Sequence, residues 1–237
     1  MIDITGKPLA SMYFMQIVWG LRKEPFIGVR PVNHANETCS TGAWQFTNAI
    51  DSWSWHGYEG AKAVVEVYAS ASSVRLTLNS KVVGTKPVRK FKTIFKVAYQ
   101  PGTLTAEALD EKGNVISRHS LTTAGPETVL TVTPEKTVLH ANGQGLCYLP
   151  IEFTDQNGCL KPYIEQRVEI EVDGAATLAG FGSALCKTDE VFDKNDHHSY
   201  RGRALAVLRA GMTPGKVKIT VKSAGVEPVT AELEVRS

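Results

Sequence analysis

The chain has 237 residues, enough for two domains of ordinary size or for one large domain. Hydrophobic residues make up 43% of it and charged residues 21%, which is typical of a globular protein. The formal net charge is +2, and no stretch is expected to gather Lys or Arg on one face, which argues against a nucleic-acid partner. No apolar run reaches the roughly 20 residues of a membrane-spanning helix, so no membrane contact is expected.

The first residues differ from the rest of the chain. The opening MIDITGKPLA has neither the basic region nor the apolar region of a signal peptide. Residues 8–21 are predicted to form a helix that begins near Pro8, because proline is tolerated in a first helical turn. This helix is apolar nearly all round, so one face should pack on the next domain. The other face should meet a second copy of the chain or stay exposed as an apolar patch.

A β-pattern follows the helical segment. Apolar and polar residues alternate over 74–78, 91–99 and 104–108, and a turn is expected at 110–114. Such alternation is typical of antiparallel strands with one solvated face. The sequence therefore predicts a small β-sandwich over residues 60–124.

A second β-rich segment begins after Thr122–Pro126, a short stretch with no apolar periodicity. Strands are expected at 129–132, 149–153, 168–172, 204–208, 217–221 and 229–235. This number of short strands in about 110 residues is typical of a β-sandwich. The predicted fold is mainly β, with two immunoglobulin-like antiparallel β-sandwich domains in tandem, 60–124 and 125–237, after an N-terminal helical segment and linker, 1–59.

Side chains that could carry chemistry are scattered. Cys39, Cys147, Cys159 and Cys186 contain no CxxC pair, which argues against zinc. Small buried thiols are favoured over a disulfide of Cys147 with Cys159 or Cys186, and the redox compartment stays open. The polar run from Asp189 to His198 is interpreted as a solvated loop without a metal ion, and Gly180–Ala184 as a tight turn with close backbone packing.

The order of several motifs resembles the C-terminal region of family 2 glycoside hydrolases, the β-galactosidase and β-glucuronidase group. These motifs are Ile2–Pro8 running into Tyr13 and Trp19, Trp53-Ser54-Trp55, Val65–Tyr68, Val74–Asn79, Ala141–Gln144, Ile151–Asp155 and Gly202–Arg209. Ser80 stands where that family usually has a turn glycine. The resemblance implies that residues 1–59 are the end of a catalytic (β/α)8 barrel with its linker. It also implies a bacterial parent enzyme, for which a periplasmic or secreted location is open.

The resemblance places the two catalytic glutamates of a retaining glycosidase upstream of Met1, on barrel strands. No catalytic residue, cofactor or metal site is therefore expected in this chain. The glutamates that are present are interpreted mostly as solvated surface charges. They are Glu66, Glu107, Glu152, Glu169 and Glu171.

The remaining candidates are the aromatic residues Trp44, Phe46, Trp53, Trp55 and Tyr58. Trp53 and Trp55 are the candidate carbohydrate-binding residues, because aromatic rings stack on sugar faces. The favoured interpretation is that they form a hydrophobic seam between domains. The predicted function is a non-catalytic accessory region that braces the parent's barrel or assembles a homo-oligomer. The alternatives are a carbohydrate-binding module and an adhesin-type immunoglobulin-like repeat.

Overall fold

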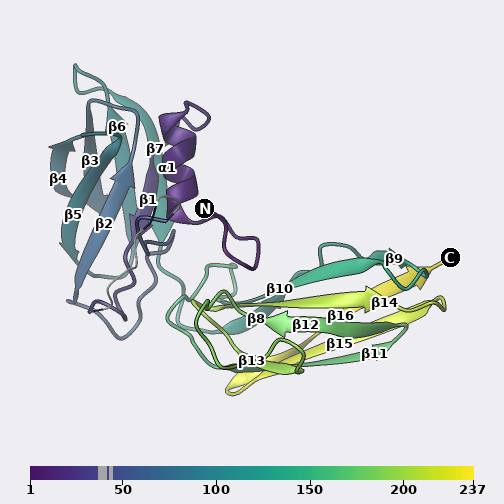
Figure 1. Cartoon of the computed structure of the whole chain (residues 1–237). Helices are drawn as coiled ribbons and strands as arrows, with labels where there is room; N and C mark the ends of the chain where they lie inside the picture. The colour runs from purple at the N-terminus through teal and green to yellow at the C-terminus, as the bar shows by residue number, and fades with distance from the viewer. Residues whose placement is uncertain (37–41, 43–44) are drawn as a thin grey trace. The chain divides into compact units, whose positions relative to one another are not determined.

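The computed structural model describes residues 1–36, 42 and 45–237. The chain divides into two compact units, Met1–Ala124 and Gly125–Ser237, each built mostly of strands (Figure 1). The prediction of a mainly β chain made of sandwich-like sheets is confirmed.

The first unit contains two sheets and one helix. The three-stranded sheet has the order β1-β2-β5. Its strands are β1 (Phe26–Val29), β2 (Lys62–Tyr68) and β5 (Lys92–Ala98). The four-stranded sheet has the order β4-β3-β6-β7. Its strands are β3 (Ser73–Leu78), β4 (Lys81–Pro87), β6 (Thr103–Leu109) and β7 (Val115–Thr122). All of their pairings are antiparallel.

Alternating side chains form the core of this unit. On β3, Val74 and Leu76 are fully buried, whereas Arg75 and Thr77 between them are half-buried. The residues in register on β6 repeat this pattern, since Leu76 pairs with Ala106, which is also buried. Period-two sequence patterns therefore locate this core correctly.

The turn between β3 and β4 departs from the usual sequence chemistry. Asn79 and Ser80 have φ values of 50° and 64°, the left-handed backbone that a type I′ hairpin turn requires at both central positions. Asn79 suits this conformation, and its side chain accepts a hydrogen bond from the Thr103 N–H at 2.9 Å. Ser80 occupies the position where glycine is preferred.

The first sheet extends across the boundary expected at residues 59–60. Strand β1 lies within residues 1–59, yet it pairs with β2 over its full length, from Phe26 opposite Tyr68 to Val29 opposite Val65. The short apolar run Phe26–Val29 is buried on both faces, so it has no alternation that the sequence analysis could detect. In the structure this segment supplies an edge strand of the first unit.

The predicted helix over 8–21 is shorter in the structure, where α1 spans Ala10–Val18. Leu9 is the N-cap residue and offers no side-chain cap, and the chain leaves the helix at Trp19. The helix buries Ala10 and Ile17, and Tyr13 stacks on Phe26 of β1 with ring centroids 4.2 Å apart. One face of α1 is therefore held on the first sheet (Figure 1).

The second unit is a larger sandwich. One sheet has the order β12-β14-β10-β8. Its strands are β8 (Val129–Val132), β10 (Leu146–Thr154), β12 (Ala176–Gly182) and β14 (Arg203–Ala210). The other sheet has the order β13-β11-β15-β16-β9. Its strands are β9 (Val138–His140), β11 (Arg167–Gly174), β13 (Asp196–His198), β15 (Gly215–Ser223) and β16 (Val226–Arg236).

Three local expectations for this unit need correction. The sandwich is not wholly antiparallel, because β9 pairs with β16 in parallel. The segment 189–198 is not loop throughout, since residues 196–198 form β13 beside β11. Residues 180–182 end strand β12 rather than make a turn, although the close packing is real. A Cβ on Gly182 would lie 2.4 Å from the Phe192 ring.

The cysteines do not share one environment. All three described cysteines are free thiols, as favoured over a disulfide, but only Cys147 is buried, whereas Cys159 is half-buried and Cys186 is exposed. Cys39 lies outside the described residues. Within the described part of the chain, no helix combines the length and the apolar character needed to cross a membrane.

Candidate functional site

The two candidate tryptophans lie inside the first unit. Trp53 and Trp55 are both fully buried. Trp53 meets Tyr99 edge to face at 5.0 Å between ring centroids, and its Nε1 donates to the carbonyl oxygen of Gln100 at 3.0 Å. The Trp55 N–H donates to the Tyr99 hydroxyl. Buried rings cannot stack on a sugar from solvent, so this geometry assigns both tryptophans to the core. Trp44, from the same aromatic run, lies outside the described residues.

One buried charge is Glu66 on β2, which the sequence analysis placed among the solvated charges. This interpretation is wrong for Glu66, which is fully buried. Its Oε1 accepts hydrogen bonds from Arg30 Nε at 2.8 Å and from Thr47 Oγ1 at 3.0 Å. Its Oε2 lies 2.5 Å from Lys92 Nζ and accepts from the Tyr68 hydroxyl at 2.9 Å.

These contacts keep Glu66 ionised. Burial alone would raise the pKa of this carboxyl, but the hydrogen bonds from Lys92 and Arg30 outweigh it and hold the pKa below its ordinary value. Burial and the charge of Glu66 raise the pKa of Tyr68. A carboxylate whose two oxygens are both occupied by partners is poorly placed to act as nucleophile or acid. We call Glu66, Arg30, Lys92, Tyr68 and Thr47 the Glu66 cluster.

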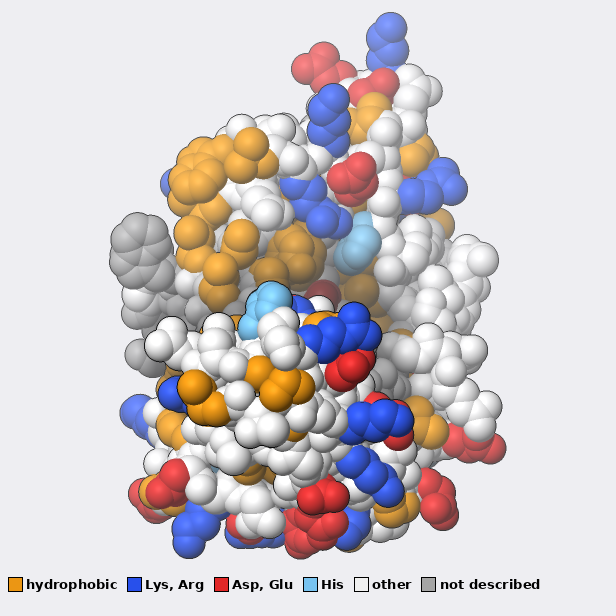
Figure 2. Space-filling model, turned by 90° about the vertical axis from the view of Figure 1, so that its right-hand side faces the viewer, with side chains coloured by type: hydrophobic (Ala, Val, Ile, Leu, Met, Phe, Trp, Pro, Cys, Tyr) orange, Lys and Arg blue, Asp and Glu red, His pale blue; other side chains and the backbone are white. Residues whose placement is uncertain are grey.

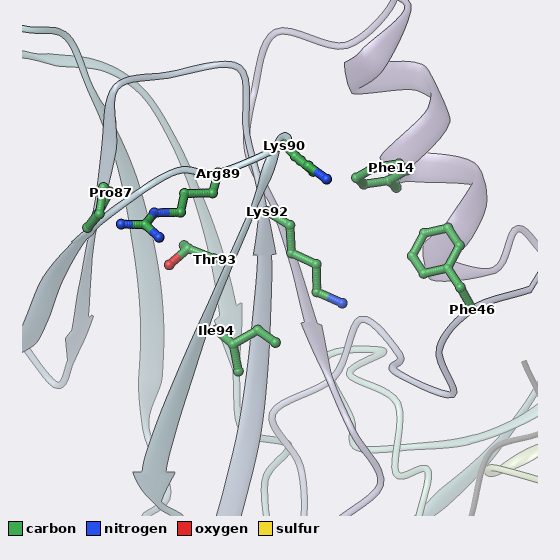
Figure 3. A pocket seen from close by; sticks show the side chains of 8 residues that line it. All are labelled: Phe14, Phe46, Pro87, Arg89, Lys90, Lys92, Thr93 and Ile94. Carbon is green, nitrogen blue, oxygen red and sulfur yellow. The ribbon is translucent and has the colours of Figure 1, made fainter.

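A groove opens beside this cluster (Figure 3). Its volume is about 530 Å³. One wall is formed by Phe14 of α1 and by Phe46, whose rings meet edge to face at 5.0 Å. The lining on the β4–β5 side consists of Pro87, Arg89, Lys90, Lys92, Thr93 and Ile94. Figure 3 shows the side chain of Lys90 directed toward Phe14 and that of Arg89 directed toward Pro87.

The groove borders a basic segment that the sequence analysis overlooked. No acidic residue occurs between Glu66 and Glu107. Within this stretch, residues 81–96 contain Lys81, Lys86, Arg89, Lys90, Lys92 and Lys96. The expectation concerned Lys or Arg gathered on one face, and it did not single out this run along the chain. The signal is visible in the sequence and is masked only by the near-neutral total charge.

The N-terminal segment also exposes apolar side chains. Ile2 and Ile4 are 55% and 60% exposed, and Trp19 and Leu21, after the end of α1, are 61% and 73% exposed. Figure 2 shows hydrophobic side chains gathered on the face of the first unit that carries α1. Ile2 and Ile4 precede α1 and Trp19 and Leu21 follow it, so they form two exposed pairs at the two ends of the helix, which we call together the N-terminal apolar patch. One isolated exposed apolar residue is ordinary, but several in one segment indicate an interaction surface.

The polar run of the second unit is folded into ion pairs. Arg167 of β11 pairs with Asp196 of β13 and lies 3.7 Å from Glu190. Glu190 also contacts Nδ1 of His198 at 2.9 Å and Nδ1 of the buried His197 at 3.4 Å. Among the residues that the structure describes, no group of three or more His, Cys, Asp or Glu has an arrangement suited to a metal ion.

Family models match part of each unit. Residues 130–232 match the model of "Glycoside hydrolase family 2 C-terminal domain 5". Residues 60–117 match a domain of unknown function, DUF4982. The two matched ranges fall on the two sandwiches described above.

Individual relatives agree with these matches. A β-galactosidase of Bacteroides ovatus is 26% identical over 98% of this chain, and a β-glucuronidase of Formosa agariphila is 25% identical over 98% of it. The chain spans 25% and 22% of their lengths, about a quarter of each. A solved family 2 glycosyl hydrolase of Bacteroides cellulosilyticus has a TM-score of 0.86 at 26% identity, over 100% of this chain and 31% of that one.

Proposed function

We propose that this chain, which belongs to the C-terminal region of the family 2 glycoside hydrolases, is an accessory region that docks on the catalytic part of such an enzyme. The carrying observation is the N-terminal apolar patch. Its two pairs flank α1, and Tyr13 of α1 stacks on Phe26 of β1, so the patch lies at the ends of a held element. The matched relatives are about four times longer than this chain, which leaves ample protein to cover the patch.

Burial of this patch supplies a driving force for docking. Fully burying one large apolar side chain contributes roughly 1.5–3 kcal/mol, and four such side chains are mostly exposed here. The partner we infer is a (β/α)8 catalytic barrel with an apolar surface of its own. A retaining β-galactosidase-like activity belongs to that partner in this proposal, because two relatives carry glycosidase names.

The proposal predicts that the isolated chain is catalytically inert. Nitrophenyl galactoside and nitrophenyl glucuronide should be hydrolysed no faster than in buffer, because Glu66 is occupied by four partners and no carboxylate pair is assigned a catalytic role. A Glu66→Gln variant serves as the control for contaminating glycosidase. Turnover by the unsubstituted chain that disappears in the Glu66→Gln variant would contradict the accessory role.

Docking itself is tested by hydrogen exchange. The chain is compared alone and joined to a family 2 catalytic domain in one polypeptide. Amides around Trp19 should exchange more slowly in the joined protein, and a Trp19→Ser/Leu21→Ser double variant should remove the protection. A matched variant on an exposed apolar site of the second unit, Met212→Ser, should leave it unchanged. Equal exchange in the isolated and joined proteins would exclude this patch as the docking surface.

The adhesin-type repeat is the less supported alternative. Glycosidases match over 98% of the chain, including residues 1–59, which an immunoglobulin-like repeat alone would not need. Trp53 and Trp55 do not support the alternative of a glycan-binding module, because both side chains are buried. Any glycan site must therefore lie elsewhere on the surface.

A further inference from the structure

We propose that the groove between Phe14 and Phe46 on one side and Lys90 and Lys92 on the other binds a sugar ring that carries an anionic group. This inference is independent of the docking surface proposed above. It concerns Phe14 and Phe46 together with β5 and its preceding turn, whereas the docking proposal uses the exposed residues before and after α1.

The groove has the form of a small-ligand site. Its volume of about 530 Å³ falls within the range of roughly 300–1,000 Å³ that is usual for such sites. The phenyl rings of Phe14 and Phe46 and the side chain of Ile94 provide apolar surface, and lysines provide the few polar groups (Figure 3). Sugars combine C–H faces, which pack on aromatic rings, with polar edges.

The charges favour an anion. In the Glu66 cluster, two cations, Arg30 and Lys92, surround one carboxylate, which leaves one positive charge in excess. Lys90 adds a second positive charge on the groove side (Figure 3). The nearest acidic residue along the chain after Glu66 is Glu107, so no local carboxylate on this stretch compensates Lys90. An incoming carboxylate or sulfate would complement this excess.

The turn that presents Lys90 is fixed in an unusual conformation. Lys90 and Phe91 have φ values of 51° and 62°, the type I′ turn backbone that normally selects Asn and Gly. Two hydrogen bonds between Arg89 and Lys92 close the turn, and the Ala69 N–H donates to the Phe91 carbonyl oxygen at 3.0 Å. Residues in such backbone regions often occur at ligand sites, where the surrounding structure holds them.

Protection of sheet edges does not account for Lys90. Lysines on exposed edge strands prevent strand pairing between molecules, and Lys81, Lys86 and Lys96 on the strands β4 and β5 fit that role. Lys90 lies in the connecting turn and not on a strand. Its direction toward an aromatic wall is better explained by a ligand that has both an apolar face and a negative charge.

The test uses three probes that differ in one substituent: methyl glucoside, methyl glucuronide and methyl glucoside 6-sulfate. Amide chemical shifts of the whole chain are followed by NMR during titration. We expect one or both anionic probes to shift the amide signals of residues 89–94 in a salt-dependent manner. The neutral glucoside should bind at least about tenfold more weakly. The stronger of the two anionic probes identifies the charged group as carboxylate or sulfate.

The chain contains its own matched control. Lys90→Ala should weaken binding by about tenfold, the loss of one charge-assisted contact. Lys81→Ala removes the same charge from an exposed site on β4 that does not line the groove, so it should have at most about a twofold effect through screened electrostatics. Phe46→Leu should also weaken binding while the remaining spectrum stays folded.

Several outcomes would overturn the proposal. These are the absence of a shift with any probe at millimolar concentration, equal binding of the neutral glucoside, and equal losses in Lys90→Ala and Lys81→Ala. Tighter binding of a glutamate-rich peptide that displaces the sugars would identify the groove as a docking site for an acidic protein segment. That result would also refute the sugar assignment.

Discussion

At the scale of single residues, Glu66 shows how a buried charge is tolerated. Arg30, Lys92, Tyr68 and Thr47 satisfy both carboxylate oxygens, so the ionised group has replaced its lost hydration with four protein contacts. Removing one member of such a set leaves the others uncompensated. The same cluster connects three parts of the chain, because Arg30 follows β1, Glu66 lies on β2 and Lys92 begins β5.

Glu66→Gln is therefore expected to destabilise the first unit by about 3 kcal/mol, at the lower end for breaking a buried pair because Arg30 is half-exposed. Urea unfolding followed by the fluorescence of the buried tryptophans measures this change. The control Glu59→Gln alters an exposed residue and should change stability by less than about 0.5 kcal/mol. Equal effects of the two substitutions would contradict the assigned role of Glu66.

The pH dependence of Glu66 has a definite sign. Its pKa is lowered in the folded state, so its contribution to stability is complete above the unfolded value of roughly 4.3 and is lost as the pH falls through the folded value. Unfolding titrations in this acid range should show a steeper loss of stability for the parent protein than for Glu66→Gln. Parallel curves for the two proteins would refute the linkage.

At the scale of elements, His119 fastens the edge strand β1 to the neighbouring sheet. Its Nδ1 on β7 accepts a hydrogen bond from the Ile27 N–H at 3.2 Å, and its ring stacks on Phe26. Burial, assisted by the charge of Arg22, lowers the pKa of His119 below its ordinary value. A neutral ring is required, because a protonated Nδ1 can no longer accept this hydrogen bond.

His119 should therefore make the first unit sensitive to mild acid. Because its folded pKa lies below the unfolded value of roughly 6.5, its contribution is complete above that pH and is lost as the pH falls toward the folded value. His119→Gln should flatten the dependence of the unfolding free energy on pH between about 7 and 5. His56→Gln, at a histidine whose side chain is 79% exposed, is the control and should keep the dependence.

A substitution in the turn between β3 and β4 is expected to stabilise the first unit. Ser80 has a positive φ of 64°, which costs a residue with a Cβ roughly 1–2 kcal/mol and costs glycine little. Ser80→Gly is therefore expected to raise the unfolding free energy of the first unit by about 1 kcal/mol. Ser73→Gly, on the extended strand β3, should lower it by about 0.5–1 kcal/mol. A loss of stability in Ser80→Gly would mean that the serine side chain has a further role.

At the scale of the whole molecule, the two units are expected to unfold independently. Each has its own core and its own buried, hydrogen-bonded charged residue. In the second unit this residue is Lys161, which is fully buried. Its Nζ donates to the carbonyl oxygens of Pro126 and Glu127 and to Thr128 Oγ1, which fixes the start of this unit. Burial lowers the pKa of Lys161.

Calorimetry should then resolve two transitions. Lys161→Met leaves buried carbonyl groups without their donor. It should lower the unfolding free energy of the second unit alone, by about 1–3 kcal/mol. Glu66→Gln should lower only the other transition, and residues 125–237 expressed alone should melt cooperatively. If one substitution shifted both transitions, the stabilities of the two units would be coupled, because a change at an independent site affects only its own unit.

The sequence by itself determined those features that rest on local periodicity. Alternation over β3, β6, β11 and β15 predicted antiparallel strands with buried apolar faces, since a strand turns every second side chain to the same side. The order of motifs also indicated the family, which the comparisons support. These signals are carried by neighbouring residues, so they are readable without knowledge of the fold.

Only the tertiary structure decided which side chains lie beneath others. Glu66 has the alternating polar position of a solvated residue, but Thr47 and Arg30 contact its carboxylate, and its burial then depends on residues 19 and 36 positions away. For the same reason Trp53 and Trp55 changed from candidate sugar platforms to core residues. Phe14 and Lys90 line the same groove although more than seventy positions separate them in the sequence. No local sequence pattern predicts that they lie close together. Long-range packing chooses among the roles that local composition leaves open.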